Sequence, residues 1–225
     1  MMGRTHAASG ILAFGGAALA HVAGHNTWWD LALGTLTAMG AAMLPDLDHP
    51  KATMTKSMGP LSWLVCHAVI LPIFGGHRKG THSIAFVAIV GLAAQTALIY
   101  RDHVAGAAVL WLLLSLSWAS GVRLLKIRGW LDDVIPVVLA AGLVFVTDWD
   151  LSVVPIALMI GTAAHVAGDC LTDKGCPLLW PMSRAKFGIN LFTTGKAGET
   201  LAMIVILAGI VAEVVYAIAR WLEGS

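Results

Sequence analysis

The stretch Gly161–Thr172, GTAAHVAGDCLT, is the segment around which the rest of the chain is interpreted. It is an apolar run of small residues that carries His165 and Asp169, and their spacing of four places both side chains on one face of a helix. An imidazole and a carboxylate are costly inside a hydrophobic segment, so they indicate function by default. On this stretch alone, metal binding and a His–Asp hydrogen bond that joins two helices are equally good explanations.

The composition is that of a helical membrane protein. Of the 225 residues, 58% are hydrophobic and 12% are charged, and the mean hydropathy is +0.80. Soluble domains carry about twice that share of charge. Several long uncharged runs predict an all-α, polytopic transmembrane bundle. The net charge of +1 and the lack of a basic cluster with interleaved aromatic residues give no indication of nucleic-acid binding.

We predict one integral membrane domain over residues 1–225, with about seven spanning helices and one re-entrant or interfacial helix at 60–75. The N-terminal run resembles a signal peptide, but more membrane-like sequence follows it, so we expect it to be retained. Residues 173–198 form a long loop that is a candidate lid. The predicted spans are 7–24, 28–45, 84–100, 104–121, 131–147, 151–169 and 199–220.

The distribution of basic residues predicts the orientation. If the N-terminus is cytoplasmic and 60–75 does not cross, 12 of the 14 Lys and Arg residues lie inside, as the positive-inside rule requires. The inside set is Arg4, Lys51, Lys56, Arg78, Lys79, Arg123, Lys126, Arg128, Lys174, Arg184, Lys186 and Lys196, and the outside set is Arg101 and Arg220.

This orientation also gathers the remaining candidate ligands at the cytoplasmic ends of their helices, where residues distant in sequence could form one site. Besides the pair in the opening stretch, they are His6, Asp46, Asp48, His49, His77 and His82. Mixed histidine and carboxylate ligands favour zinc, manganese or iron over magnesium or calcium. Eight candidates exceed the ligands of one tetrahedral ion, so either two metals bind or some residues orient the ligands.

Each of these segments also has a simpler explanation. A lone N-terminal histidine such as His6 is usually a solvated interfacial residue. The motif between Pro45 and Pro50 could be a turn that ends a helix with solvated acids, although two acids and a histidine in a constrained turn favour metal binding.

The segment Gly75–Ser83 could be a basic anchor loop, but that explanation leaves its two histidines unexplained. Thr81 or Ser83 could cap the helix that follows. Arg78 and Lys79 could hold a phosphate, the arginine through its planar guanidinium.

At these residues the chain resembles the YdjM-type family of membrane-bound metal-dependent hydrolases. The matching pieces are His6, Leu44–Lys51, His77-Arg78-x-x-Thr81-His82-Ser83, His165-x-x-x-Asp169-x-x-Thr172 and Pro177–Pro181, in the family's order. The resemblance covers residues 1–83 and 160–198, and it implies a hydrolase of the bacterial inner membrane. A more distant likeness to the zinc-dependent phospholipase C and P1 nuclease group implies zinc, although the chain has no histidine after His165, so one or two ions are expected rather than three.

The expected activity is hydrolysis of a phosphoester, on a lipid or amphiphilic substrate, by a metal-activated water at the cytoplasmic face. The predicted catalytic residues are Asp48 as proton acceptor, Arg78 as the group that stabilises phosphate charge, and Thr81. The predicted metal ligands are His6, Asp46, His49, His77, His82, His165 and Asp169. The alternative functions are a metal-binding membrane protein without catalysis, or a transporter; a transporter should carry polar residues near mid-membrane.

Overall fold

The computed structural model describes residues 1–22, 27–125 and 129–224. The regular secondary structure of these residues is helical throughout, apart from two isolated β-bridges, which confirms the predicted all-α class. The end of the first predicted span, residues 23–24, lies outside the described residues, as do Lys126 and Arg128 of the predicted inside set.

Thirteen helical segments are described. In chain order they are α1 (Gly3–Leu19), α2 (Trp28–Ala41), η1 (Leu44–Asp48), α3 (Thr53–Lys56), α4 (Pro60–Leu64), η2 (Val65–Ile70), α5 (Leu71–Phe74), η3 (Gly80–His82), α6 (Ile84–Ile99), α7 (Val104–Leu125), α8 (Leu131–Phe145), α9 (Val153–Cys170) and α10 (Ala197–Gly224).

Each of the seven predicted spans corresponds to one helix, namely α1, α2 and α6 to α10. Within the described ranges, three segments are both long and apolar enough to cross a membrane: Val104–Leu124, Val153–Cys170 and Ala197–Glu223. Pro60–Phe74 and Ile84–Ile99 are shorter apolar helices. The chain is therefore an all-helical protein with apolar segments of membrane-spanning length, and the number of crossings stays a prediction.

The predicted interfacial segment is one continuous helical stretch made of α4, η2 and α5. Its middle part, η2, is a π-helical turn that ends just before Pro72. A proline lacks the amide hydrogen and its ring crowds the carbonyl one turn earlier, so a widened turn at this point relieves the conflict. The chain leaves α5 at Gly75, whose φ of 81° is a conformation that glycine adopts without strain.

Helix α9 lies at the centre of the molecule and packs against α1, α2 and α6. The approach to α2 is close, because a Cβ at Gly161 would collide with the carbonyl oxygen of Ala38. Gly40 lies on α2, as Ala38 does, and a Cβ at Gly40 would collide with the backbone of Ser117 in α7. Small residues that let backbones approach in this way are typical of helix packing in membranes.

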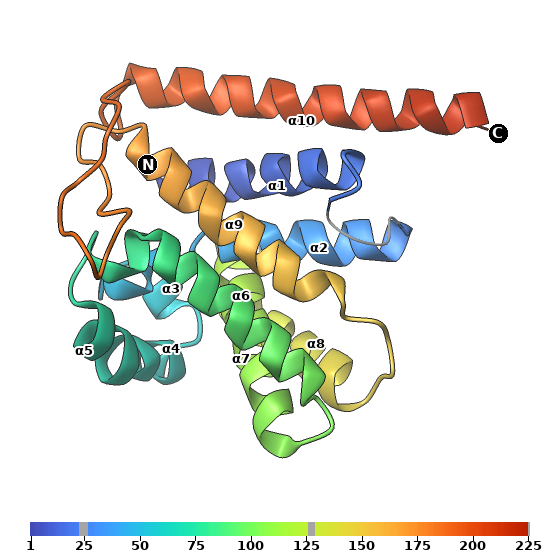
Figure 1. The fold of residues 1–225 in the computed structure, drawn as a ribbon. Coiled ribbons are helices and arrows are strands. Elements are labelled where there is room, and N and C mark those ends of the chain that lie inside the picture. The colour runs from blue at the N-terminus through green and yellow to red at the C-terminus, as the bar shows by residue number, and fades with distance from the viewer. Residues whose placement is uncertain (23–26, 126–128, 225) are drawn as a thin grey trace.

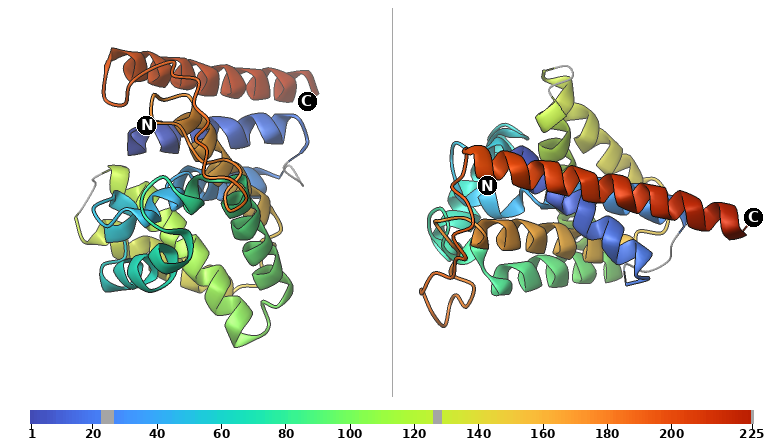
Figure 2. Two further views of the ribbon diagram at one scale, coloured as in Figure 1. Left: turned by 60° about the vertical axis from the view of Figure 1, so that its left-hand side comes forward. Right: turned by 90° about the horizontal axis from the view of Figure 1, so that it is seen from above.

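The N-terminus, the segments α3 to α5, the loop after α9 and the start of α10 all gather at one end of the bundle (Figure 1). The two further views show the same grouping, with α10 lying along the outside of α1 (Figure 2). The loop is tied back to the end of α9, because the Ile189 amide donates to the Cys170 carbonyl over 2.8 Å and the Leu191 amide to the Leu171 carbonyl over 2.9 Å. The candidate ligands lie at this end.

Candidate metal centre

Two groups of side chains in the described part of the chain have donor atoms close enough to share a metal ion. The first group is His6, His165 and Asp169, and the second is Asp46, His77 and His82. The two groups come from α1, η1, the segment before α6, and α9. The fold therefore brings together residues that are far apart in the sequence. The sequence predicted that they would meet in this way at one set of helix ends.

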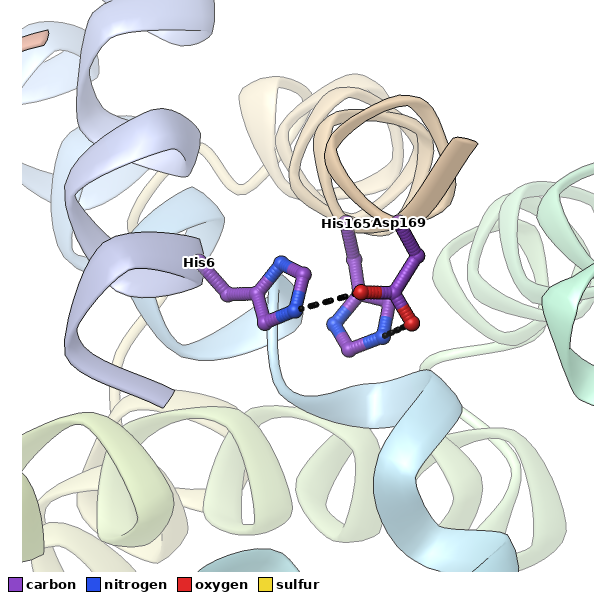
Figure 3. A group of neighbouring side chains, drawn as sticks. All are labelled: His6, His165 and Asp169. Carbon is purple, nitrogen blue, oxygen red and sulfur yellow. Dashed lines mark ion pairs between the residues drawn. The ribbon is translucent and has the colours of Figure 1, made fainter. Parts of the chain in front are cut away.

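The first group is buried between α1 and α9 (Figure 3). The His6 Nε2 lies 3.3 Å from the Asp169 Oδ1, and the His165 Nε2 lies 3.8 Å from the Asp169 Oδ2. The rings of His6 and His165 stack with centroids 3.7 Å apart. The buried His6 Nδ1 has no hydrogen-bond partner among the described residues. The one-turn spacing of His165 and Asp169 thus presents both side chains to the same neighbour.

The second group lies beside the first but is more open. The Asp46 Oδ1 is 3.9 Å from the His82 Nε2 and 4.0 Å from the His77 Nδ1. The side chain of His82 is fully buried, whereas that of Asp46 is 19% exposed and that of His77 is 39% exposed. Solvent can therefore reach the centre from the side of His77 and Asp46.

The two groups meet at His82 and His165, whose Nε2 atoms lie 3.2 Å apart. The Asp169 Oδ2 is 3.5 Å from the His82 Nε2, and the Asp46 Oδ1 is 3.8 Å from the His165 Nε2. Two ligand atoms of a tetrahedral zinc ion lie about 3.3–3.4 Å from each other. The two facing nitrogens are thus spaced like two ligand atoms of one zinc ion, whereas the two carboxylate oxygens lie 3.5–3.9 Å from them.

Hydrogen bonds place a hydrogen on the Nδ1 atom of both facing histidines. The His165 Nδ1 lies 2.6 Å from the Ala42 carbonyl oxygen, to which it can only donate. The His82 Nδ1 lies 2.9 Å from the Thr81 hydroxyl. Because that hydroxyl donates its own hydrogen to Asp48, it accepts from His82. In the tautomer with hydrogen on Nδ1 alone, both Nε2 atoms are acceptors that face each other and two carboxylate oxygens, which is the form in which a histidine binds a metal through Nε2.

Asp48 holds this arrangement from behind. Its carboxylate is fully buried and accepts hydrogen bonds from the His77 Nδ1 at 3.0 Å, from the Arg78 amide at 3.1 Å and from the Thr81 hydroxyl. Burial alone would raise the pKa of the Asp48 carboxyl. Hydrogen bonds from His77, His82 and Thr81 lower this pKa by a larger amount, so it lies below its ordinary value. Asp48 therefore acts as an ionised orienter of the histidines.

Arg78 lies beside the centre in a left-handed backbone conformation, with φ of 58°. Its Nη2 is 2.8 Å from the Asp169 Oδ2, and its Nη1 donates to the Thr172 hydroxyl over 3.2 Å. Its Nε is buried and has no hydrogen-bond partner in the part of the chain that the structure describes. A non-glycine residue with positive φ is costly, so the surrounding contacts must hold it there.

Comparison with known proteins gives the same family over the whole chain. The family described as YdjM inner membrane protein matches residues 1–223. The chain belongs to the YdjM family. It is 26% identical over 184 residues to "Inner membrane protein YdjM" of Escherichia coli (strain K12) and equally similar to the protein of that name from Shigella flexneri. The match covers 81% of this chain but 65% of each relative, which is just under two thirds of their length. No solved structure matches the chain.

The YdjM membership and the apolar helices make the chain an inner membrane protein that carries His/Asp groups able to bind a metal. The names of the relatives state no reaction, metal or orientation. Six of the seven predicted ligands fall in the two groups; the exception is His49. Its Nδ1 accepts from the Lys51 amide over 3.1 Å, and its ring lies edge-on to His77 with centroids 4.9 Å apart.

The predicted catalytic residues of the YdjM-family chain occupy different places. Arg78 borders the centre, whereas Asp48 and Thr81 lie behind the histidines and orient them. Ser83 caps α6, since its hydroxyl accepts from the Phe86 amide over 3.2 Å. The sequence interpretation missed the orienting role of the Ala42 carbonyl, because a main-chain oxygen has no signal in residue type.

Proposed function

We propose that the chain is a membrane-embedded metal-dependent hydrolase that cleaves a phosphoester of a lipid or other amphiphile at the cytoplasmic face. The observation that supports it is the pair of Nε2 atoms of His82 and His165, which face each other and two carboxylate oxygens. The N-terminal ammonium of Met1 and the Arg78 guanidinium already pair with Asp169, and a metal ion among the acceptors would offset their remaining mutual repulsion.

The donor set fits a divalent transition metal. His6, His165 and Asp169 are the residues that would hold one ion, and Asp46, His77 and His82 would hold a second. Nitrogen and carboxylate donors at these separations favour zinc, with manganese as the alternative. Such a metal supplies a Lewis acid and lowers the pKa of water toward neutrality.

The remaining residues of the site would position the substrate and move the proton. The Arg78 guanidinium, already next to Asp169, can turn its fork to a phosphate oxygen and stabilise charge there. Asp48 is saturated with hydrogen bonds, so of the two aspartates only the partly exposed Asp46 could accept a proton, and only where it does not bind the metal. Thr81 and Asp48 would keep the two histidine rings in their ligand orientation.

A non-catalytic metal site is the second candidate, and the burial of His6, His82, His165 and Asp169 favours it, because a structural site is closed. The exposure of His77 and Asp46 favours catalysis, because a catalytic site keeps a position open to water. A transport path is the weakest candidate, since the ionisable cluster lies at or near the helix ends.

The test is elemental analysis of the detergent-purified protein beside His165→Ala and the matched control His103→Ala, which lies in the loop before α7. We expect near-stoichiometric zinc or manganese in the wild type and in His103→Ala, and loss of the metal in His165→Ala. The loaded wild type should then release phosphate or a phosphorylated headgroup from phospholipid vesicles. A folded wild type that takes up no transition metal when supplied with it would overturn the proposal; metal without hydrolysis would favour the non-catalytic site.

A further inference from the structure

A cavity lies beside the candidate metal centre, and Arg78 is one of the residues that line it. It has a volume of about 450 Å³ and lies between the end of the α4–α5 stretch and the loop that follows α9. It is distinct from the His/Asp cluster, because none of the six residues of that cluster lines it. A substrate could therefore bind in it while its reacting group faces the metal ligands.

The polar wall of the cavity is entirely basic. Arg78 and Lys79 line it from one side, and Arg184 and Lys186 from the loop, while none of the described residues that line it is acidic. Among these four cations, only Arg78 has an ion-pair partner in the described structure, and its buried Nε has no hydrogen-bond acceptor. Four like charges around one cavity repel each other, and an anion that carries more than one charge offsets this repulsion best.

The other wall is apolar and faces outward. Pro72 and Ile73 of α5 line it, and the Ile73 side chain is 58% exposed. The Trp180 ring lines it as well and packs on Phe74 with ring centroids 5.4 Å apart. An exposed isoleucine and a tryptophan beside basic residues are the combination found where a protein meets the membrane–water interface. The cavity thus offers a phosphate site next to a surface for acyl chains.

We propose that this cavity binds the headgroup of the substrate, and that the substrate is a lipid whose headgroup carries at least two negative charges, such as a phosphomonoester or a pyrophosphate, rather than a zwitterionic phospholipid. This proposal rests on the proposed function, because it names the substrate class of the same site. Arg184 and Lys186 select for headgroup charge, and Arg78 joins the bound phosphate to the metal ligands. The loop predicted as a lid therefore contributes charge recognition.

The test is a binding competition on the full-length protein in detergent, once with chelator and once with zinc. Dioleoyl phosphatidic acid and dioleoyl phosphatidylcholine are offered at equal concentration, and the bound lipid is counted by native mass spectrometry. The variants are Arg184→Gln with Lys186→Gln and, as a matched control, Lys51→Gln with Lys174→Gln, which removes two exposed cations outside the cavity. A parallel arm offers glycerol 3-phosphate, which carries the same phosphate without acyl chains.

We expect the wild type to prefer phosphatidic acid by about tenfold or more, the cavity variant to lose most of that preference, and the control to keep it. Equal loss in both variants would show general attraction to a basic face and would overturn the proposal, as would a folded wild type without preference. Glycerol 3-phosphate that binds as well as the lipid would overturn the lipid assignment. The preference for phosphatidic acid should persist when the chelator removes metal. A protein that selects phosphatidic acid but holds no metal would therefore refute the proposed hydrolase and leave the proposed role of this cavity intact.

Discussion

Helices α9 and α10 are both long and apolar enough to cross a membrane, yet they are used in opposite ways. The mean hydropathy of the best window is 1.5 in α9 and 2.6 in α10, while 67% of the α9 window and 0% of the α10 window is buried in the molecule. Of the three candidate spans, the one with the highest window hydropathy is therefore the one whose window is least buried. Helix α9, whose window is less hydrophobic, contributes His165 and Asp169 to the candidate metal centre.

Asp169 of α9 and Glu213 of α10 both lie toward α1, with different surroundings, whereas Glu199 at the start of α10 accepts from the Met2 amide. Asp169 of α9 reaches His6, Arg78 and the other histidines. The carboxylate of Glu213 in α10 lies over Gly15 and Gly16, where any added Cβ would approach it closely. A carboxylate in an apolar helix is a functional candidate by default, but only the first has nitrogen donors around it in the described structure.

The largest expected contrast between the two helices is in metal binding. Asp169→Asn keeps the shape of the side chain but removes the charge and one oxygen donor, so we expect metal affinity to fall by more than about 100-fold, beyond the loss from an orienting residue. Glu213→Gln should leave the affinity unchanged. Zinc titration of both purified variants against a competing chelator measures this, and equal losses would end the distinction between the two carboxylates.

The next contrast is in packing. Gly161→Val drives a side chain into the backbone of Ala38 and toward the Ala41 Cβ at 2.8 Å, so we expect it to cost about 3 kcal/mol or more in the free energy of unfolding. Gly209→Val in α10 meets the Leu12 Cδ1 at 2.9 Å, the end of a side chain that can turn away, and should cost below about 1 kcal/mol. Thermal unfolding in detergent compares the pair; a stable Gly161→Val protein would contradict the close crossing of α9 and α2.

The smallest contrast comes from enlarging one apolar side chain. Val154→Leu in α9 adds a methylene at a fully buried position and should cost about 1–2 kcal/mol. Val205→Leu in α10, where the side chain is 62% exposed, should change the free energy of unfolding by less than about 0.5 kcal/mol. Similar shifts in both unfolding curves would indicate that α10 is covered by a further protein surface.

The helices were predictable because hydropathy and helix breakers mark them locally. Thr27 forms a capping box with Asp30 at the start of α2, and Ser83 caps α6 at the residue before its first turn. The π-helical turn before Pro72 was not predicted, because one proline in an apolar run fits a kink, a break or a widened turn equally well. The close crossing at Gly161 depends on which helix faces it, which no local pattern states.

The sequence predicted which residues lie together at the site, but it did not predict the role of each of them. The sequence indicated that His6, His82, His165 and Asp169 lie at one end of the bundle, and the structure places them within contact of one another. Asp46 and Asp48 are two residues apart and chemically identical, so only the fold could distinguish the one that faces the histidines from the one behind them. The position of the Arg78 side chain depends on a left-handed backbone conformation, which an arginine in the sequence does not indicate.

The metal centre joins the first helix to the ninth, and this has a consequence for how the protein is made. His6 leaves the ribosome early, but the pair on α9 follows about 160 residues later, after most of the bundle has already entered the membrane. The donor atoms cannot meet until α9 lies against α1 and α2. On the proposed function, metal loading is therefore a late step of biogenesis, which follows the packing of α9 against α1 and α2.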